Sequence, residues 1–157
     1  MLRNSNKVST VISMILTGLL FLALCALALC LPMVVTSMID TVDNIGDRAS
    51  ITATERALVL TNAYAMVLVA FIADVLLFFL LRKVLRSQVF SDSAVRLIAS
   101  VSWCCFAEAL LFLLIGGFFQ LAFGVAIAAC CLGVCLRVVK NVIAEATRIK
   151  SENDYTI

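Results

Sequence analysis

Residues Arg82 to Arg96, with the sequence RKVLRSQVFSDSAVR, are the only charged interruption in the middle of a very apolar chain. This connector carries the basic residues Arg82, Lys83, Arg86 and Arg96 against one acid, Asp92. Basic segments stay on the cytoplasmic side of a membrane, because Lys and Arg are costly to move across it. We therefore predict that the connector is cytoplasmic and that it joins two helical hairpins.

The composition indicates an integral membrane protein. Of 157 residues, 64% are hydrophobic and 14% are charged, whereas a soluble domain has about 45–50% apolar and about 25% charged residues. The excess of apolar residues predicts contact with a lipid bilayer. The basic residues nowhere form a run dense enough to indicate direct binding of nucleic acid.

Four apolar runs are long enough to cross the bilayer, which takes about 20 residues, and we place the spans at about 8–32, 57–81, 97–115 and 118–136. The first run is longer than the apolar region of a signal peptide, which has about 7–15 residues. We therefore expect a retained helix with Pro32 near its outer end. Residues 40–56 are expected to form the outer connection, whose aspartates do not have the spacing of a calcium loop.

Local signals set the ends of the later helices. Thr52-Ala-Thr-Glu55 has the pattern of a capping box, which predicts that the second helix begins near Ala53. Residues 97–136 as one helix would be about 60 Å long, twice the hydrocarbon thickness. Since adjacent glycines weaken a helix, we place the break at Gly116-Gly117.

The charge distribution supports this topology. Of the twelve Lys and Arg residues, only Arg48 and Arg56 fall on the outer side of the four predicted spans. The fold class is therefore predicted to be all-α: a single domain (1–157) forming a four-helix transmembrane bundle of two helical hairpins, with both termini cytoplasmic. Residues 137–150 keep a helical pattern, so a cytoplasmic helix and tail (137–157) are expected beyond the last span.

Two carboxyl groups lie inside the predicted spans, Asp74 and Glu108. Their positions along the helices place them at similar depth, and intramembrane acids often mark proton or ion pathways. Ser13 and Thr17 belong to a polar stripe of the first helix that could donate hydrogen bonds to them. One hypothesis is that at least one acid serves function; the alternative is that both are neutral and bridge helices.

The remaining motifs favour packing over chemistry. The seven cysteines all lie in apolar runs, and with no His and no paired CxxC motifs no zinc site is expected. No cofactor or other metal is expected either. The chain has no catalytic triad, phosphate loop or hydrolase elbow, so we expect no enzyme.

Small residues on the fourth helix either pack within the bundle or form the seam of a homo-oligomer: Gly124, Ala128, Cys131 and Cys135.

Two stretches carry a family resemblance: residues 89–96 (VFSDSAVR) and 145–157 (EATRIKSENDYTI). They resemble the bacterial domain-of-unknown-function family numbered twenty-nine seventy-five. Its members are small four-span membrane proteins with a Phe-Ser element before the third helix and a tail like Lys-Ser-Glu-Asn-Asp-Leu-Thr-Val/Ile. Here Tyr155 stands where Leu is usual, and Val89 where Pro or Ala often precedes the Phe.

The resemblance implies a location in the bacterial plasma membrane and a regulatory role. The family has no assigned activity, but its genes often sit beside one for a small helix-turn-helix repressor, which would be a cytoplasmic partner. On this interpretation Ser91 or Ser93 caps the third helix, and the partner-binding residues are Phe90, Ser91, Asp92, Arg96, Glu152, Asn153, Asp154 and Tyr155. Alternatively, the connector and the tail pack against each other. A second functional hypothesis is a small transporter or ion-coupled sensor that uses Asp74 and Glu108.

Overall fold

A computed structural model describes residues 2–45, 52–86 and 91–154. The described residues form helices and turns without a strand, in the order α1 (Leu2–Ile45), α2 (Ala53–Leu85), α3 (Asp92–Ile115) and α4 (Leu121–Asp154). All four helices are long and apolar enough to cross a membrane. The all-α prediction with four spanning helices is confirmed, and many large apolar side chains are exposed along the helices, as lipid contact requires.

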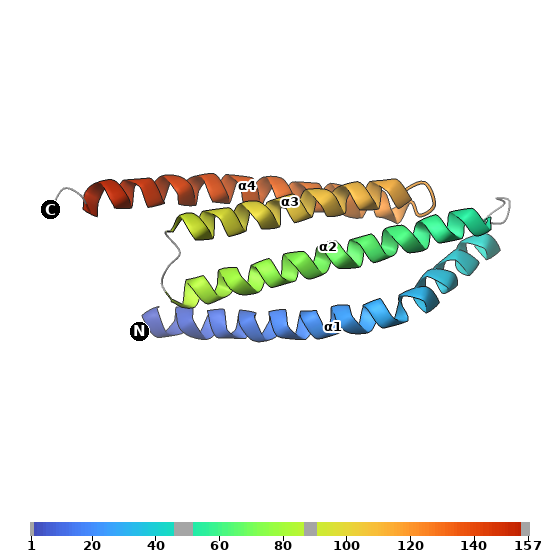
Figure 1. The fold of residues 1–157 in the computed structure, drawn as a ribbon, viewed down its shortest axis with the longest axis horizontal. Helices are drawn as coiled ribbons and strands as arrows, with labels where there is room; N and C mark the ends of the chain where they lie inside the picture. The colour runs from blue at the N-terminus through green and yellow to red at the C-terminus, as the bar shows by residue number, and fades with distance from the viewer. Residues whose placement is uncertain (1, 46–51, 87–90, 155–157) are drawn as a thin grey trace.

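The helices pack in chain order (Figure 1). Helix α2 packs against α1 and α3, and α3 packs against α4, whereas no Cα atom of α1 lies within 8 Å of α3 or α4 among the described residues. The beginning of α1, the end of α2, the start of α3 and the end of α4 lie at one end of the molecule, which we call the terminal end. The opposite end, with the α1–α2 and α3–α4 connections, is the hairpin end. The two hairpins predicted from the sequence are therefore present.

Helix α1 runs further than the sequence indicated. Pro32 lies inside it, and the helix continues to Ile45 with a bend along its second half (Figure 1), which is the usual effect of a proline. The predicted outer connection at 40–56 is therefore too long. The physical reason is an apolar stripe on α1, with one residue at every fourth position around and after the proline. The stripe consists of Leu31, Val35 and Ile39, and it packs in one cluster with Val59 of α2.

The hairpin end also holds an ion pair that belongs to this longer helix. Asp40, expected in a loop, lies in α1, where its carboxylate accepts a hydrogen bond from the Arg56 guanidinium at 2.9 Å. Because both side chains are well exposed, the pair adds about 0–1 kcal/mol to stability. It joins the last turns of α1 to the first turn of α2.

Both predicted helix starts have the expected caps. At α2 the Thr52 amide donates to the Glu55 carboxylate at 2.8 Å, and the Glu55 amide donates to the Thr52 hydroxyl at 3.4 Å, which is the capping box. At α3 the cap is Ser91, whose hydroxyl accepts from the Ala94 amide. Ser93, the other candidate, instead accepts a hydrogen bond from Lys83 at 2.7 Å.

The break between α3 and α4 lies at the glycine pair, as predicted. Gly116 has an ordinary right-handed conformation (φ −58°), so it does not need glycine's backbone freedom. A Cβ there would lie 2.7 Å from the ring of Phe123, so a larger residue at this position would have to displace that exposed ring. Residues 116–120 form the turn, and α4 begins at Leu121, slightly later than the predicted 118.

Close packing holds α3 against α4. The buried Ser102 hydroxyl donates to the carbonyl oxygen of Gly133 at 2.9 Å. A Cβ on Gly133 would lie 2.9 Å from the Phe106 ring, so the ring occupies the space that a side chain would fill. Small residues allow helices in membranes to approach in this way.

We predict that Gly133→Leu destabilises the helix pair, because the new side chain overlaps the Phe106 ring and overpacking costs about 1–3 kcal/mol. The measurement is the unfolding midpoint of the purified protein in mild detergent. Gly124→Leu is the matched control, since it lies on the same helix with nothing within 4 Å of its Cβ position. Equal midpoints for the two variants would contradict the packing described here.

Candidate functional site

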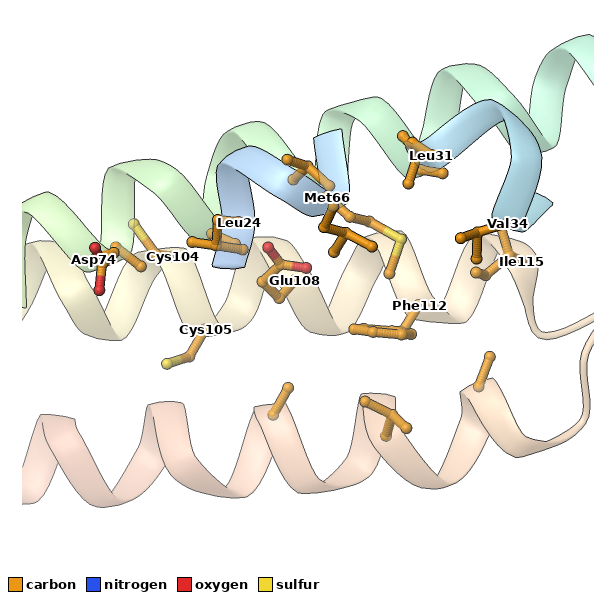
Figure 2. A pocket seen from close by; sticks show the side chains of 18 of the residues that line it. Leu24, Leu31, Val34, Met66, Asp74, Cys104, Cys105, Glu108, Phe112 and Ile115 are labelled. Carbon is orange, nitrogen blue, oxygen red and sulfur yellow. The ribbon is translucent and has the colours of Figure 1, made fainter. Parts of the chain in front are cut away.

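A cleft of about 790 Å³ lies between the helices, within the part of each that is expected in the membrane. All four helices contribute to its wall, which consists almost entirely of Leu, Val, Ala, Met and Phe side chains (Figure 2). Its outer walls come from α1 and α4, which have no backbone contact with each other. The cleft therefore exists because the helices pack in chain order and the first and last do not close the ring.

Asp74 and Glu108 both line this cleft, from α2 and α3 (Figure 2). Asp74 is only 5% exposed. One oxygen of each carboxyl group, Oδ1 of Asp74 and Oε1 of Glu108, is buried without a hydrogen-bond partner. Both acids that the sequence singled out therefore line one cleft, and their closeness to each other stays a prediction. A buried polar atom without a hydrogen-bond partner lowers the stability of the folded protein.

The hydroxyl groups of Ser13 and Thr17 on α1 donate hydrogen bonds within their own helix. The Thr17 hydroxyl, which is buried, donates to the backbone oxygen of Ser13 at 2.8 Å, and the Ser13 hydroxyl donates to the backbone oxygen of Ser9 at 3.1 Å. Among the described residues, the hydroxyl groups of Ser13 and Thr17 therefore donate to their own helix and not to the carboxyl groups that the sequence had suggested as acceptors. The reason is local: a Ser or Thr hydroxyl in a helix reaches the carbonyl four residues back.

No Lys or Arg is among the described residues that line the cleft; the only side chains with polar atoms are Cys104, Cys105, Asp74 and Glu108. Arg137, on α4, is engaged elsewhere: its guanidinium lies over the Trp103 ring at 4.5 Å and near the Phe106 ring at 6.0 Å, a favourable cation–π arrangement. No basic side chain of the described cleft lining is therefore available as a counter-ion to the two acids. Sequence reasoning found the acids but not the cleft, since helix packing order has no signal in the sequence.

One polar contact between helices carries no charge. The Asn62 side chain, on α2, donates to the backbone oxygen of Leu111, on α3, at 3.0 Å. Sequence reasoning did not identify Asn62 as a residue that joins two helices. Unlike Asp74, this polar side chain has a defined partner.

The predicted partner-binding residues lie at the terminal end as far as they are described. Ser91 caps α3, and Asp92 and Arg96 are exposed on its first turns. Glu152 is exposed on the last turns of α4, in a charged cluster with Arg148 and Glu145. Phe90 and Tyr155 lie outside the described residues, as do the side chains of Asn153 and Asp154, so contact between connector and tail stays a prediction.

The small-residue stripe of α4 faces away from the bundle. Its residues are all exposed: Gly124, Ala128, Cys131 and Cys135. Packing of this stripe within the bundle, one of the two alternatives, is therefore wrong; α4 instead buries Ala122, Ala126 and Gly133. The homo-oligomer seam stays a prediction. Within the described residues, no cluster of His, Cys, Asp and Glu is able to hold a metal ion.

Residues 42–157 match the family described as "Protein of unknown function (DUF2975)". The chain belongs to this family. The match covers α2, α3 and α4 with both acids and both motif segments, while most of α1 precedes it. No curated protein and no solved structure matches the chain. The resemblance seen in the two motif segments is thus confirmed at the level of the family, whose description assigns no activity.

We predict that Asp74→Leu leaves the stability of the protein unchanged or raises it, because the substitution removes a buried oxygen that has no partner. Asn62→Leu is the matched contrast on the same helix; it removes a hydrogen bond between helices, worth on the order of 0.5–1 kcal/mol in membrane proteins. Unfolding midpoints in detergent report both. A clear loss of stability in Asp74→Leu would show that the carboxyl group bridges helices.

Proposed function

We propose that this chain is a non-enzymatic regulatory protein of the bacterial plasma membrane, and that its terminal end is cytoplasmic and binds a soluble partner. A small helix-turn-helix regulator is the partner that the family resemblance implies. The observation that carries the proposal is the shared location of the two motif regions: the start of α3 and the end of α4 lie at the same end of the molecule (Figure 1). A soluble protein is able to contact both at once.

The end of α4 supports this role. The α4 helix has 34 residues and α3 has 24, so at about 1.5 Å per residue α4 is about 15 Å longer than its neighbour. Because the two helices meet at the hairpin end, the extra length projects from the terminal end (Figure 1). The projecting turns expose both charged side chains and the apolar Ile149. Mixed charged and apolar surface on a projecting helix favours a protein contact.

The charged side chains on the last turns of α4 add little to the stability of the helix, and they support a role in recognising a partner. The Arg148 guanidinium donates to the Glu145 carboxylate at 2.6 Å and lies 3.7 Å from the Glu152 carboxylate. All three side chains are more than half exposed, so the pairs stabilise the helix only slightly. At the start of α3, exposed Asp92 and Arg96 present both signs of charge. Charges placed in this way steer association and select the partner.

The positive charges support the cytoplasmic assignment. Ten of the twelve Lys and Arg residues belong to the predicted cytoplasmic segments, which include the connector and the end of α4. The remaining two are Arg48 and Arg56, and Arg56 lies at the hairpin end against Asp40. This asymmetry is the one that orients membrane proteins during insertion.

A second function, a small transporter or ion-coupled sensor, is favoured by one specific observation. The cleft holds two carboxyl groups, each with one buried oxygen that has no hydrogen-bond partner, in a part of the molecule that is expected in the membrane, and intramembrane acids commonly lie on ion or proton pathways. The two functions place the sensitive residues in different regions: the terminal end for a regulator, Asp74 and Glu108 for a transporter.

We expect deletion of residues 151–157 to weaken binding of a small helix-turn-helix regulator, the partner that the family resemblance implies, by at least tenfold, because the deletion removes the motif tail. Binding is measured with both purified proteins, the membrane protein in lipid nanodiscs. Thr54→Ala, an exposed change at the hairpin end, is the control that keeps wild-type affinity. Equal affinity after the deletion, or no binding by the wild type, would refute the proposed partner.

We also predict the orientation. The experiment uses a variant without the native cysteines and a maleimide that does not cross the plasma membrane but reaches its outer surface. A cysteine introduced at Ser93 is expected to react only after the cells are opened, whereas a cysteine introduced at Thr54 is expected to react in intact cells. The reason is the basic connector, which stays on the cytoplasmic side. The opposite labelling pattern would show that the terminal end is outside the cell, where a cytoplasmic regulator is unable to reach it.

A further inference from the structure

The cleft has the dimensions of a small-molecule site. Pockets that bind small molecules usually have about 300–1,000 Å³, and the cleft, at about 790 Å³, falls within that range. Its wall is apolar over its length except near the two acids. A molecule that fits this wall must therefore bury a large apolar surface and present few polar atoms.

The two acids determine what those polar atoms must be. Asp74, 5% exposed, points into the cleft with Oδ1 unpartnered, and Glu108 lies on the neighbouring helix with Oε1 unpartnered (Figure 2). The described lining offers neither a positive charge nor a hydroxyl group to them. A carboxylate in an apolar environment is stabilised by a cation or by hydrogen-bond donors close by. The charge that complements the acids has to come from the molecule in the cleft.

Other occupants satisfy only part of the site. An acyl chain of a bilayer lipid matches the apolar wall but offers no donor to the carboxyl groups. A metal ion requires several oxygen ligands around it, and the described residues form no such cluster. A second copy of the chain would present apolar faces such as that of α1, which has no charged residue from Val8 to Ile39.

We propose that the cleft between α1 and α4 binds a lipophilic organic cation, with Asp74 and Glu108 as its counter-ions. The apolar body of the ligand lies against the leucine, valine and phenylalanine side chains, and its positive centre lies beside the two carboxyl groups. The absence of backbone contact between α1 and α4 leaves a side through which a molecule dissolved in the bilayer enters. This inference goes beyond the proposed regulatory function and does not depend on it, because it concerns a different region.

The test compares two probes of the same size and shape but opposite charge. The full-length protein in nanodiscs of zwitterionic phosphatidylcholine is titrated with radiolabelled tetraphenylphosphonium. Saturable binding is expected, and an excess of unlabelled tetraphenylphosphonium displaces the label, whereas tetraphenylborate does not. The neutral lipid surface keeps non-specific adsorption of the cation low and equal among the variants.

Three variants locate the binding. The double substitution Asp74→Asn with Glu108→Gln is expected to weaken binding of the cation at least tenfold, because it removes both negative charges and keeps nearly the same volume. Ala129→Phe, on the α4 wall of the cleft, weakens binding by filling space without changing charge. Asp40→Asn, an exposed acid at the hairpin end that does not line the cleft, is the control and keeps wild-type affinity.

The outcomes separate the possibilities. No saturable binding of tetraphenylphosphonium, or equal binding of tetraphenylborate, overturns the proposal. Binding that survives the double carboxamide variant but is lost in Ala129→Phe also overturns it, since the cleft would then select an apolar molecule without regard to charge. Unfolding midpoints of each variant, measured in the same nanodiscs, show whether lost binding reflects lost structure. The partner-binding experiment uses neither the probes nor these variants, so either result stands without the other.

Discussion

In the hydrocarbon of a membrane, every backbone amide and carbonyl group needs a partner within the protein, because no water is present to supply one. This constraint explains why the described chain is helical over its apolar length. It also explains why polar side chains act where helices begin: Thr52 with Glu55 at α2 and Ser91 at α3 satisfy amides that the helix itself leaves open. Once the backbone is satisfied internally, side-chain packing alone decides how the helices are arranged.

That packing is uneven along the series of helices. Between α3 and α4, Gly133 admits the Phe106 ring and accepts a hydrogen bond from Ser102, so these two helices approach closely. Between α2 and α3 the side-chain hydrogen bonds include that from Asn62 to the Leu111 carbonyl. Helix α1 is held through its stripe against α2 and has no backbone contact with α3 or α4. The cleft is the consequence, because the series of helices does not close upon itself.

The acids and the terminal end are two separate regions with different physical characters. In the cleft, Asp74 is buried and Glu108 is half-buried, and each has one buried oxygen without a hydrogen-bond partner, an arrangement that costs stability. At the terminal end, Arg148 and Glu152 are exposed and contribute little to stability. A ligand that entered the cleft would contact residues of all four helices, including α4, whose end carries the exposed charges. The same helix therefore belongs to both regions.

The sequence alone determined the number of helices, the cap at Thr52, the break at Gly116 and the presence of two acids within the apolar spans, since apolar length and capping patterns are local properties. Only the tertiary structure decided that α1 continues past Pro32, because the reason is the packing of a stripe on α2. It likewise decided that the first and last helices stay apart and leave a cleft. Which helix faces pack together depends on side-chain shapes that meet only in three dimensions, and no local pattern encodes that.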